Sequence, residues 1–188
     1  MGCDGECFVC PGLELVEVAS FTLAAAIDLA TPAAFVLTMF DPTALHSIYM
    51  FTAADSSNEL SYWFVQQFAF TVLLGHADAH TKNFSLLLRP TGIVLAPLYD
   101  VVPVGLYPVY DQDLTMKIGG ARRPQAAGIS HWRKLARRVD LDEDRVADLV
   151  TGIAEGLAER NEFAWDLLDR VQSEAMRTTV NRNTEKVL

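Results

Sequence analysis

The residues best suited to chemistry lie in one short polar segment between two apolar stretches. Residues 75–83 read GHADAHTKN, which supplies two imidazoles, a carboxylate, an ammonium and an amide. Loops of this kind display catalytic side chains when a rigid scaffold holds both of their ends. We therefore treat this segment as the candidate functional site.

The order of the polar residues in this segment matches what phosphoryl transfer requires. A carboxylate must orient the attacking hydroxyl, and oxygen ligands must hold Mg²⁺ against the phosphates. Protein kinases use the pattern H-x-D-x-x-x-x-N for this purpose, followed after a hairpin by a second metal-binding Asp. His76, Asp78 and Asn83 fit the pattern, and Asp100 follows later in the sequence Pro-Leu-Tyr-Asp.

A predicted β-hairpin lies between Asn83 and Asp100 and explains how these two residues can meet. Two short apolar runs, residues 84–88 and 93–96, flank a turn that contains Pro and Gly. Antiparallel strands return the chain to its starting point, so Asn83 and Asp100 should meet at the open end of the hairpin. An amide oxygen and a carboxylate are hard ligands that suit Mg²⁺.

Two further side chains belong to the predicted site. Asp78 should stand beside the metal ligands, and Lys82 could offer its ammonium to a transferring phosphate. His80 is more simply explained as a histidine that holds the loop than as a proton-transfer group. An alternative interpretation is a zinc hydrolase in which His76 and His80 bind Zn²⁺ with Asp78 between them.

Helices are predicted on both sides of the site. Residues 59–75 form a helix that is apolar all round, which Ser56, Ser57 or Asn58 could cap and Gly75 could end. Three more helices are predicted after the hairpin. Ser130 caps the first, Asp142 caps the second, and the third runs from about Asn161 through Val171.

Three zones differ in composition along the chain. Residues 1–57 are an apolar N-terminal segment with two prolines that divide it into short pieces, residues 58–178 hold the site and its helices, and residues 179–188 are a polar tail that we expect to fray. Asp28 and Pro32 interrupt the most apolar stretch, which argues against a membrane span.

Charge and cysteine content exclude some classes of function. The formal net charge of −9 argues against a nucleic-acid-binding surface, and the basic run 133–138 is expected to be a solvated helix face. The three cysteines all lie within the first ten residues and offer neither a paired spacing nor a fourth zinc ligand nearby. A reducing cytoplasm is therefore the expected location.

The motif DAHTKNFS at 78–85, together with LAPLYDV at 95–101, resembles the HipA-like C-terminal domain. The resemblance implies a mainly α fold with a short β-hairpin, organised like the C-terminal lobe of a protein kinase. It also implies a serine/threonine kinase toxin of a type II toxin–antitoxin system, with a helix-turn-helix antitoxin as partner and a protein as substrate.

The resemblance also implies a role for individual residues of the motif. The resemblance makes Asp78 the catalytic carboxylate and Asn83 and Asp100 the Mg²⁺ ligands. Lys82 lies in the same motif and is expected to assist catalysis. Tyr99 should lie near the nucleotide, and we expect His80 on the same cofactor-binding side.

The sequence departs from the family pattern in two ways. His76 stands where the family commonly has Asn, and no lysine precedes Lys82, so the lobe that grips ATP is not recognisable. We therefore expect ATP as co-substrate only with a complementary, separately encoded N-terminal lobe, and negligible activity alone. The alternative is a truncated remnant that acts as a binding module without catalysis.

Overall fold

The computed structural model describes residues 58–89, 92–164 and 168–188, together with a few residues before them, Val16, Ala19, Ser20, Leu23, Ala24, Ile27 and Leu29. Most of the N-terminal segment, with its cysteines and its apolar stretch, lies outside the described residues. The part of the chain that is described is mainly helical with one two-stranded sheet, as the sequence predicted.

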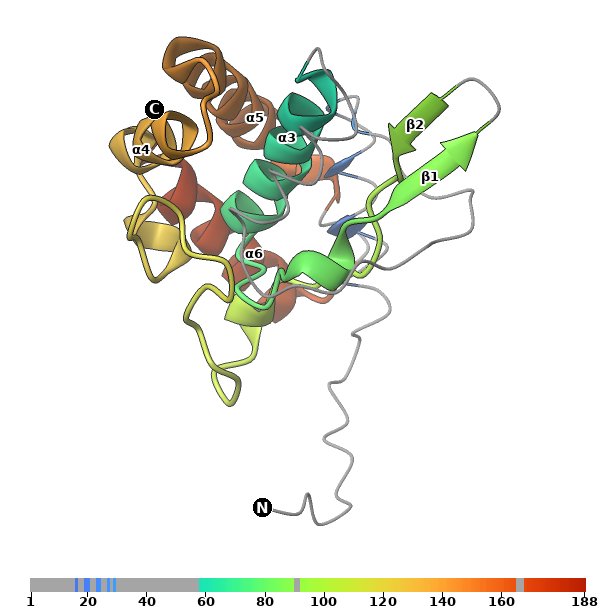
Figure 1. The fold of residues 1–188 in the computed structure, drawn as a ribbon. Coiled ribbons are helices and arrows are strands. Elements are labelled where there is room, and N and C mark those ends of the chain that lie inside the picture. The colour runs from blue at the N-terminus through green and yellow to red at the C-terminus, as the bar shows by residue number, and fades with distance from the viewer. Residues whose placement is uncertain are drawn as a thin grey trace, which may run out of the picture.

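The elements follow one another in the order helix, hairpin, helices. They are α3 (Glu59–Leu74), β1 (Leu86–Arg89), β2 (Gly92–Leu95), α4 (Ile129–Arg138), α5 (Glu143–Ala164) and α6 (Arg170–Thr184). Three short 3₁₀ turns lie between them, η1 (Thr81–Asn83), η2 (Val104–Leu106) and η3 (Pro124–Ala126). In Figure 1 the hairpin projects to one side of the helices.

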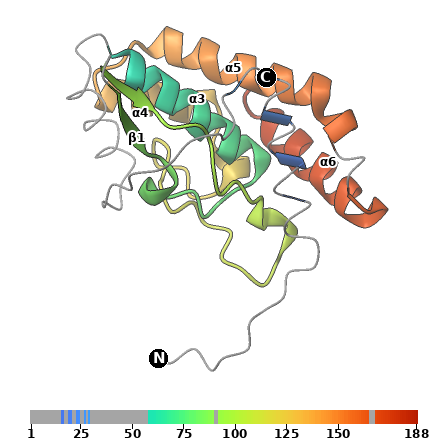
Figure 2. The same cartoon turned by 90° about the vertical axis from the view of Figure 1, so that its right-hand side faces the viewer.

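Helix α3 forms the centre of the described fold. Its apolar side chains point in all directions, and it packs against α5 and α6 (Figures 1 and 2). Gly75 ends the helix in the left-handed conformation, with φ of 95°, as predicted. A Cβ atom at this position would lie 2.7 Å from Thr179 Cγ2, so close packing also requires glycine here. Asn58 occupies the N-cap position, but its side chain makes no capping hydrogen bond.

The hairpin has a fixed register and is tied to α3. Leu86 pairs with Leu95, and Arg89 pairs with Gly92. The amide of Ala96 donates to the Ser85 carbonyl at 2.7 Å, which extends the pairing toward the open end. The Gln67 side chain of α3 donates to the Ala96 carbonyl at 2.9 Å, so the open end of the hairpin is anchored on the central helix.

The later helices confirm one predicted cap and contradict another. Asp142 accepts a hydrogen bond from the Arg145 amide at 2.7 Å, as expected of an N-cap. Ser130, in contrast, lies inside α4, which begins after Gly128. The prediction failed because a serine near a helix start resembles a cap in sequence even when the helix begins before it.

The predicted third helix was placed too early. Helix α5 continues to Ala164, and α6 begins only at Arg170. The Asp169 carboxylate accepts from the amides of Val171 and Gln172, which satisfies the first turn of α6 and fixes where this helix begins. Val171, the last residue of the predicted third helix, lies in the first turn of α6 and is 78% exposed.

The expectation of a frayed tail at 179–188 was wrong. Thr179, Val180 and Asn183 are buried on α6. The Asn183 amide group donates to the Leu73 carbonyl at 3.0 Å, near the end of α3. Polar composition misled the prediction because these side chains find hydrogen-bond partners inside the fold. The tail therefore packs against the end of α3, where the polar segment 75–83 begins.

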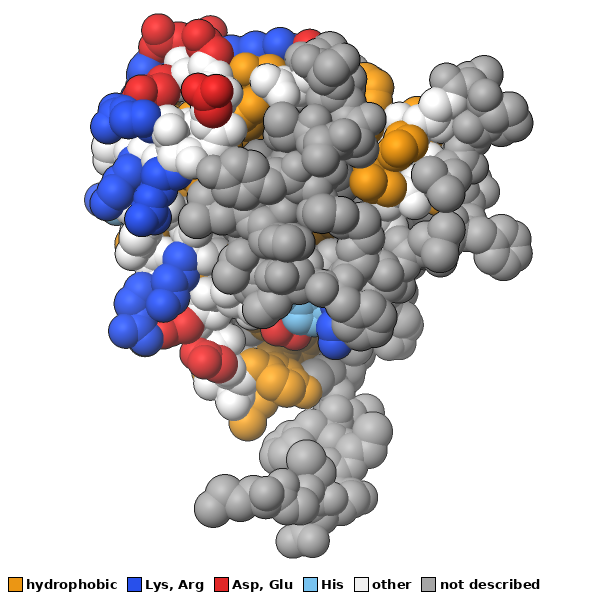
Figure 3. Space-filling view, in the orientation of Figure 1, with side chains coloured by type: hydrophobic (Ala, Val, Ile, Leu, Met, Phe, Trp, Pro, Cys, Tyr) orange, Lys and Arg blue, Asp and Glu red, His pale blue; other side chains and the backbone are white. Residues whose placement is uncertain are grey.

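The outer surface agrees with one further expectation. Lys and Arg side chains gather over α4 in Figure 3, where Arg133 pairs with Asp144 and Arg137 with Glu143. The basic run is therefore a solvated helix face. Within the described residues, no helix combines the length and apolarity needed to cross a membrane.

An aromatic cluster links α3 to the hairpin and to α4. The Phe68 ring lies 5.6 Å from Phe64, 6.0 Å from Phe84 and 5.7 Å from Trp132 between ring centroids. Phe68 is fully buried, so its removal leaves a cavity at the point where three elements meet.

We expect Phe68→Ala to lower the free energy of unfolding by about 3–5 kcal/mol, because a buried aromatic ring is lost and the cavity collapses only partly. The measurement is urea unfolding followed by circular dichroism. Trp63→Ala is the matched control on the same helix, since Trp63 is 45% exposed, and its cost should be about 1 kcal/mol or less. Equal losses for the two variants would contradict the central position of Phe68.

Candidate functional site

The polar segment 75–83 is held by a later part of the chain. The Gly105 amide donates to the Gly75 carbonyl at 3.2 Å, and the Thr115 amide donates to the Ala77 carbonyl at 3.0 Å. The Thr115 hydroxyl also faces Asp78, with Oγ1 and Oδ1 3.4 Å apart. Residues 101–115 therefore form the second wall of the site and orient Asp78, whose side chain is exposed.

Asn83 and Asp100 meet as the hairpin predicted. Asn83 Nδ2 donates to Asp100 Oδ2 at 2.5 Å, and Asn83 Oδ1 accepts from the His80 amide at 3.1 Å. Asn83 is buried, whereas Asp100 is exposed. Asp100 has φ of 53°, a left-handed conformation that is uncommon outside glycine and is often found at functional sites.

Tyr99 braces the loop on the side of the first strand. Its hydroxyl donates to the Lys82 carbonyl and lies 2.9 Å from Ser85 Oγ. Partial burial raises the pKa of Tyr99, so the hydroxyl stays protonated and able to donate. Lys82 contributes its carbonyl to this contact, and the residue is exposed. The predicted role of Tyr99 and His80 beside a nucleotide stays a prediction.

His76 is buried behind Asp78 and has a defined tautomer. Only 4% of the residue is exposed, and Nδ1 bonds the Val102 carbonyl. A carbonyl accepts hydrogen bonds, so Nδ1 must carry the proton and Nε2 presents a lone pair. Nε2 is buried without a hydrogen-bond partner in the described structure. Desolvation by burial lowers the pKa of His76, although the Val102 bond and the charges of Asp100 and Asp78 oppose this.

The zinc interpretation of His76, Asp78 and His80 was wrong. Among residues 58–89, 92–164 and 168–188 and the few described before them, no three His, Cys, Asp or Glu side chains are placed to share a metal ion. The segment does not continue α3 past Gly75, so the i, i+4 spacing of the two histidines does not put them on one helix face. An Mg²⁺ site has a smaller requirement, since one or two protein oxygens with phosphates and water suffice.

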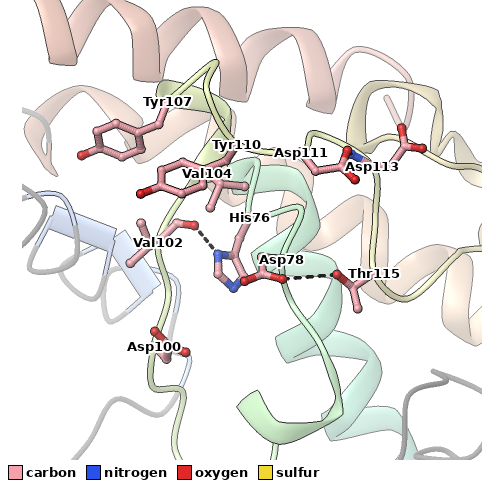
Figure 4. Close-up of a pocket in the computed structure, with 10 residues that line it drawn as sticks. All are labelled: His76, Asp78, Asp100, Val102, Val104, Tyr107, Tyr110, Asp111, Asp113 and Thr115. Atoms are coloured by element: carbon pink, nitrogen blue, oxygen red, sulfur yellow. Dashed lines mark hydrogen bonds between the residues drawn. The ribbon is translucent and has the colours of Figure 1, made fainter. Parts of the chain in front are cut away.

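A pocket of about 440 Å³ joins these residues to side chains that the sequence did not single out. Figure 4 shows His76 and Asp78 in its middle, Thr115 to the side of Asp78, Asp100 at one end, and Tyr107 and Tyr110 together along one wall. The rest of the lining is Val102, Val104, Asp111 and Asp113. Sequence spacing gave no signal for Thr115, because it reaches Asp78 across 37 residues. Figure 3 shows acidic, basic and histidine side chains beside an apolar patch on this face.

Comparison with known proteins identifies the family. The sequence model of the HipA-like C-terminal domain matches residues 44–160, more than half of the chain. The chain belongs to the HipA-like C-terminal domain family. The match includes every residue of the candidate site.

Two curated relatives carry kinase names. A "Putative kinase Y4mE" from Sinorhizobium fredii is 33% identical over 102 residues, which cover 52% of this chain and 24% of that protein. The "Serine/threonine-protein kinase toxin HipA" of Shewanella oneidensis is 45% identical over 49 residues, which cover 26% of this chain and 11% of the relative. The matched parts are thus a small share of either relative.

The fold is that of a solved HipA. The structure of the Shewanella oneidensis HipA, HipB and operator DNA complex aligns with a TM-score of 0.76 at 15% identity, over 94% of this chain and 55% of that one. This confirms the mainly α, kinase-like fold with its short hairpin. The chain spans about half the length of the HipA chain that it matches.

The neutral state of His76 predicts a pH dependence of stability. The unfolded chain protonates this imidazole near its ordinary pKa of 6.5, whereas the folded pKa is lower. Below 6.5 the unfolded state therefore binds more protons, and stability falls as the pH drops toward the lowered folded pKa. His76→Asn keeps a donor for the Val102 carbonyl but does not titrate, so the unfolding free energy should fall less between neutral and mildly acidic pH. If the unfolding free energy falls equally with pH in the original protein and in His76→Asn, the buried neutral state of His76 is contradicted.

Proposed function

We propose that this site carries out Mg²⁺-dependent transfer of a phosphoryl group from ATP to a serine or threonine hydroxyl of a protein. The observation that carries the proposal is the convergence of Asn83 and Asp100, at 2.5 Å, beside the exposed Asp78. Phosphoryl transfer needs oxygen ligands for the metal ion, which one amide and one carboxylate can supply. It also needs a second carboxylate that receives the acceptor hydroxyl.

The donor set fits Mg²⁺. In the structure Asn83 Nδ2 faces Asp100 and Oδ1 accepts from the His80 amide, so the Asn83 amide must turn for Oδ1 to share an ion with Asp100. Asp100 keeps Oδ1 and the rest of its exposed carboxylate. Oxygen donors of this kind suit Mg²⁺, with phosphates and water completing six ligands. When bound, the ion neutralises the charge on the phosphates.

The remaining side chains supply orientation and charge. Asp78 orients the acceptor hydroxyl and takes its proton, and the Thr115 hydroxyl fixes one oxygen of Asp78 for this task. The 3.4 Å separation is long, as catalytic hydrogen bonds often are before substrate binds. The ammonium of Lys82, an exposed residue in the middle of η1, balances negative charge on the transferred group.

We also propose an antitoxin as a partner. Support comes from the solved Shewanella oneidensis HipA, which is in complex with HipB and operator DNA. On this proposal the chain acts as part of a toxin–antitoxin pair in the cytoplasm.

Metal binding can be tested on the chain itself. Mg²⁺ should stabilise the fold by roughly 1.4 kcal/mol at about ten times its Kd, since a ligand that binds only the folded state shifts the unfolding equilibrium. Asp100→Asn should abolish this stabilisation in a thermal unfolding titration, because a carboxylate ligand is lost. Asp148→Asn, an exposed carboxylate on α5, is the matched control and should keep it. Equal responses of the two variants would contradict the metal site.

The role of Asp78 can be tested by transfer of labelled phosphate from ATP, with a nucleotide-binding lobe of a HipA relative supplied as a separate polypeptide. Asp78→Asn should slow transfer to a protein acceptor by about a hundredfold or more, because the amide cannot accept the hydroxyl proton. Its Mg²⁺-dependent stabilisation should remain. Unchanged transfer by Asp78→Asn would refute the assignment of this residue.

A further inference from the structure

One half of the pocket has no part in the proposed phosphoryl transfer. Beyond Asp78 the pocket continues to Tyr107 and Tyr110, whose ring centroids are 6.4 Å apart, and to the carboxylates of Asp111 and Asp113. Figure 4 shows the tyrosines along one wall and the two carboxylates at the far end. We call this half of the pocket the distal subsite.

The polar atoms that line the pocket mostly accept hydrogen bonds. His76 Nε2 is buried, has no partner in the described structure and lines the same pocket. The carboxylates of the lining accept, and the Thr115 hydroxyl already donates to Asp78. Apart from the tyrosine hydroxyls, the lining side chains therefore offer few donors. A ligand that satisfies them must bring its own hydrogen-bond donors.

The charge of the whole pocket favours a cation, since its lining holds four carboxylates, Asp78, Asp100, Asp111 and Asp113, against the two guanidiniums of Arg122 and Arg123. Both guanidiniums bind the Asp113 carboxylate. Asp111 is exposed and, within the described part of the chain, forms no ion pair of its own; its Oδ1 accepts only the Asp113 amide, at 2.9 Å. The Asp111 carboxylate thus keeps its negative charge for a ligand. The chain as a whole carries a net charge of −9, which attracts basic partners.

The tyrosines add a surface for an alkyl stem. Aromatic rings attract cations over their faces, and the methylenes of Lys and Arg pack on apolar surface while the charged end stays polar. At the rim, Tyr110 is 41% and Val109 is 64% exposed, so an apolar edge continues from the subsite onto the surface. A segment of another protein could rest on this edge.

We propose that the distal subsite binds a lysine or arginine side chain of the acceptor protein, next to the hydroxyl that Asp78 receives. This inference rests on the proposed function for the hydroxyl and names the sequence context in which that hydroxyl occurs. The Asp111 carboxylate pairs with the positive charge of this side chain, and its methylenes pack against the rings of Tyr107 and Tyr110. His76 Nε2 accepts an N–H group from the same segment.

Peptide binding tests the subsite without any phosphoryl transfer. The probe is a fluorescein-labelled, alanine-based peptide with a central serine and an arginine on each side, titrated with the whole chain by fluorescence anisotropy in the absence of ATP and Mg²⁺. Two matched probes replace arginine by its neutral isostere citrulline or by glutamate. The arginine peptide should bind about tenfold more tightly than the citrulline peptide, because a charge-assisted hydrogen bond is lost.

Variants of the chain locate the effect. Asp111→Asn should reduce the preference for arginine over citrulline to about twofold or less, since the charge of the subsite is removed while its shape is kept. Asp148→Asn, with its carboxylate on α5, should retain the full preference. Equal binding of the three peptides, no measurable binding of any of them, or a preference that survives Asp111→Asn would overturn the proposal. An arginine preference in a chain that shows no response to Mg²⁺ would support the subsite and count against the proposed function alone.

Discussion

The antiparallel pairing of β1 with β2 is the constraint on which the site depends. Its register, with Leu86 opposite Leu95, places Asn83 and Asp100 at the same end of the hairpin. A shift of one residue would turn every side chain of one strand to the other face and would separate these two side chains. The hydrogen bond from Gln67 to the Ala96 carbonyl secures this register against the central helix.

The rest of the fold keeps the other side of the site in place. Gly75 allows the chain to leave α3 at a sharp angle, and Thr179 and Asn183 of α6 pack against that corner. The carbonyls of Gly75 and Ala77 are satisfied by amides of the segment that follows the hairpin. The polar segment is thus held by α6 on one side and by the segment after the hairpin on the other. These contacts position Asp78 although its side chain is exposed. Fixed geometry of this kind is what phosphoryl transfer needs most, since it depends on positioning and charge.

Local signals in the sequence predicted those parts of the fold that local interactions determine. The turn between two apolar runs predicted the hairpin, and Gly75 predicted the end of α3. The meeting of Asn83 and Asp100 followed from these elements, because a hairpin relates residues at its two ends by simple geometry. The roles that we propose for Asp78, Asn83 and Asp100 came from the resemblance of the motif to the family.

Features that depend on distant residues could not be predicted in this way. The tail was expected to fray because its polar side chains gave no sign of partners, yet the Asn183 amide group donates to a carbonyl 110 residues earlier. Thr115 and the distal subsite come from an irregular segment with no periodic pattern, and only the fold brings them to Asp78. The zinc interpretation failed for a related reason, since spacing in the sequence implied a helical face where the chain had already left the helix.

The most direct test of the central claim is a crystal structure of the chain grown with Mn²⁺, which takes the same oxygen ligands as Mg²⁺ and scatters anomalously. The account predicts an anomalous peak roughly 2 Å from both Asn83 Oδ1 and a carboxylate oxygen of Asp100. A peak that touches neither residue, or an ordered site in which Asn83 and Asp100 remain bonded only to each other while Mn²⁺ binds elsewhere, would contradict it.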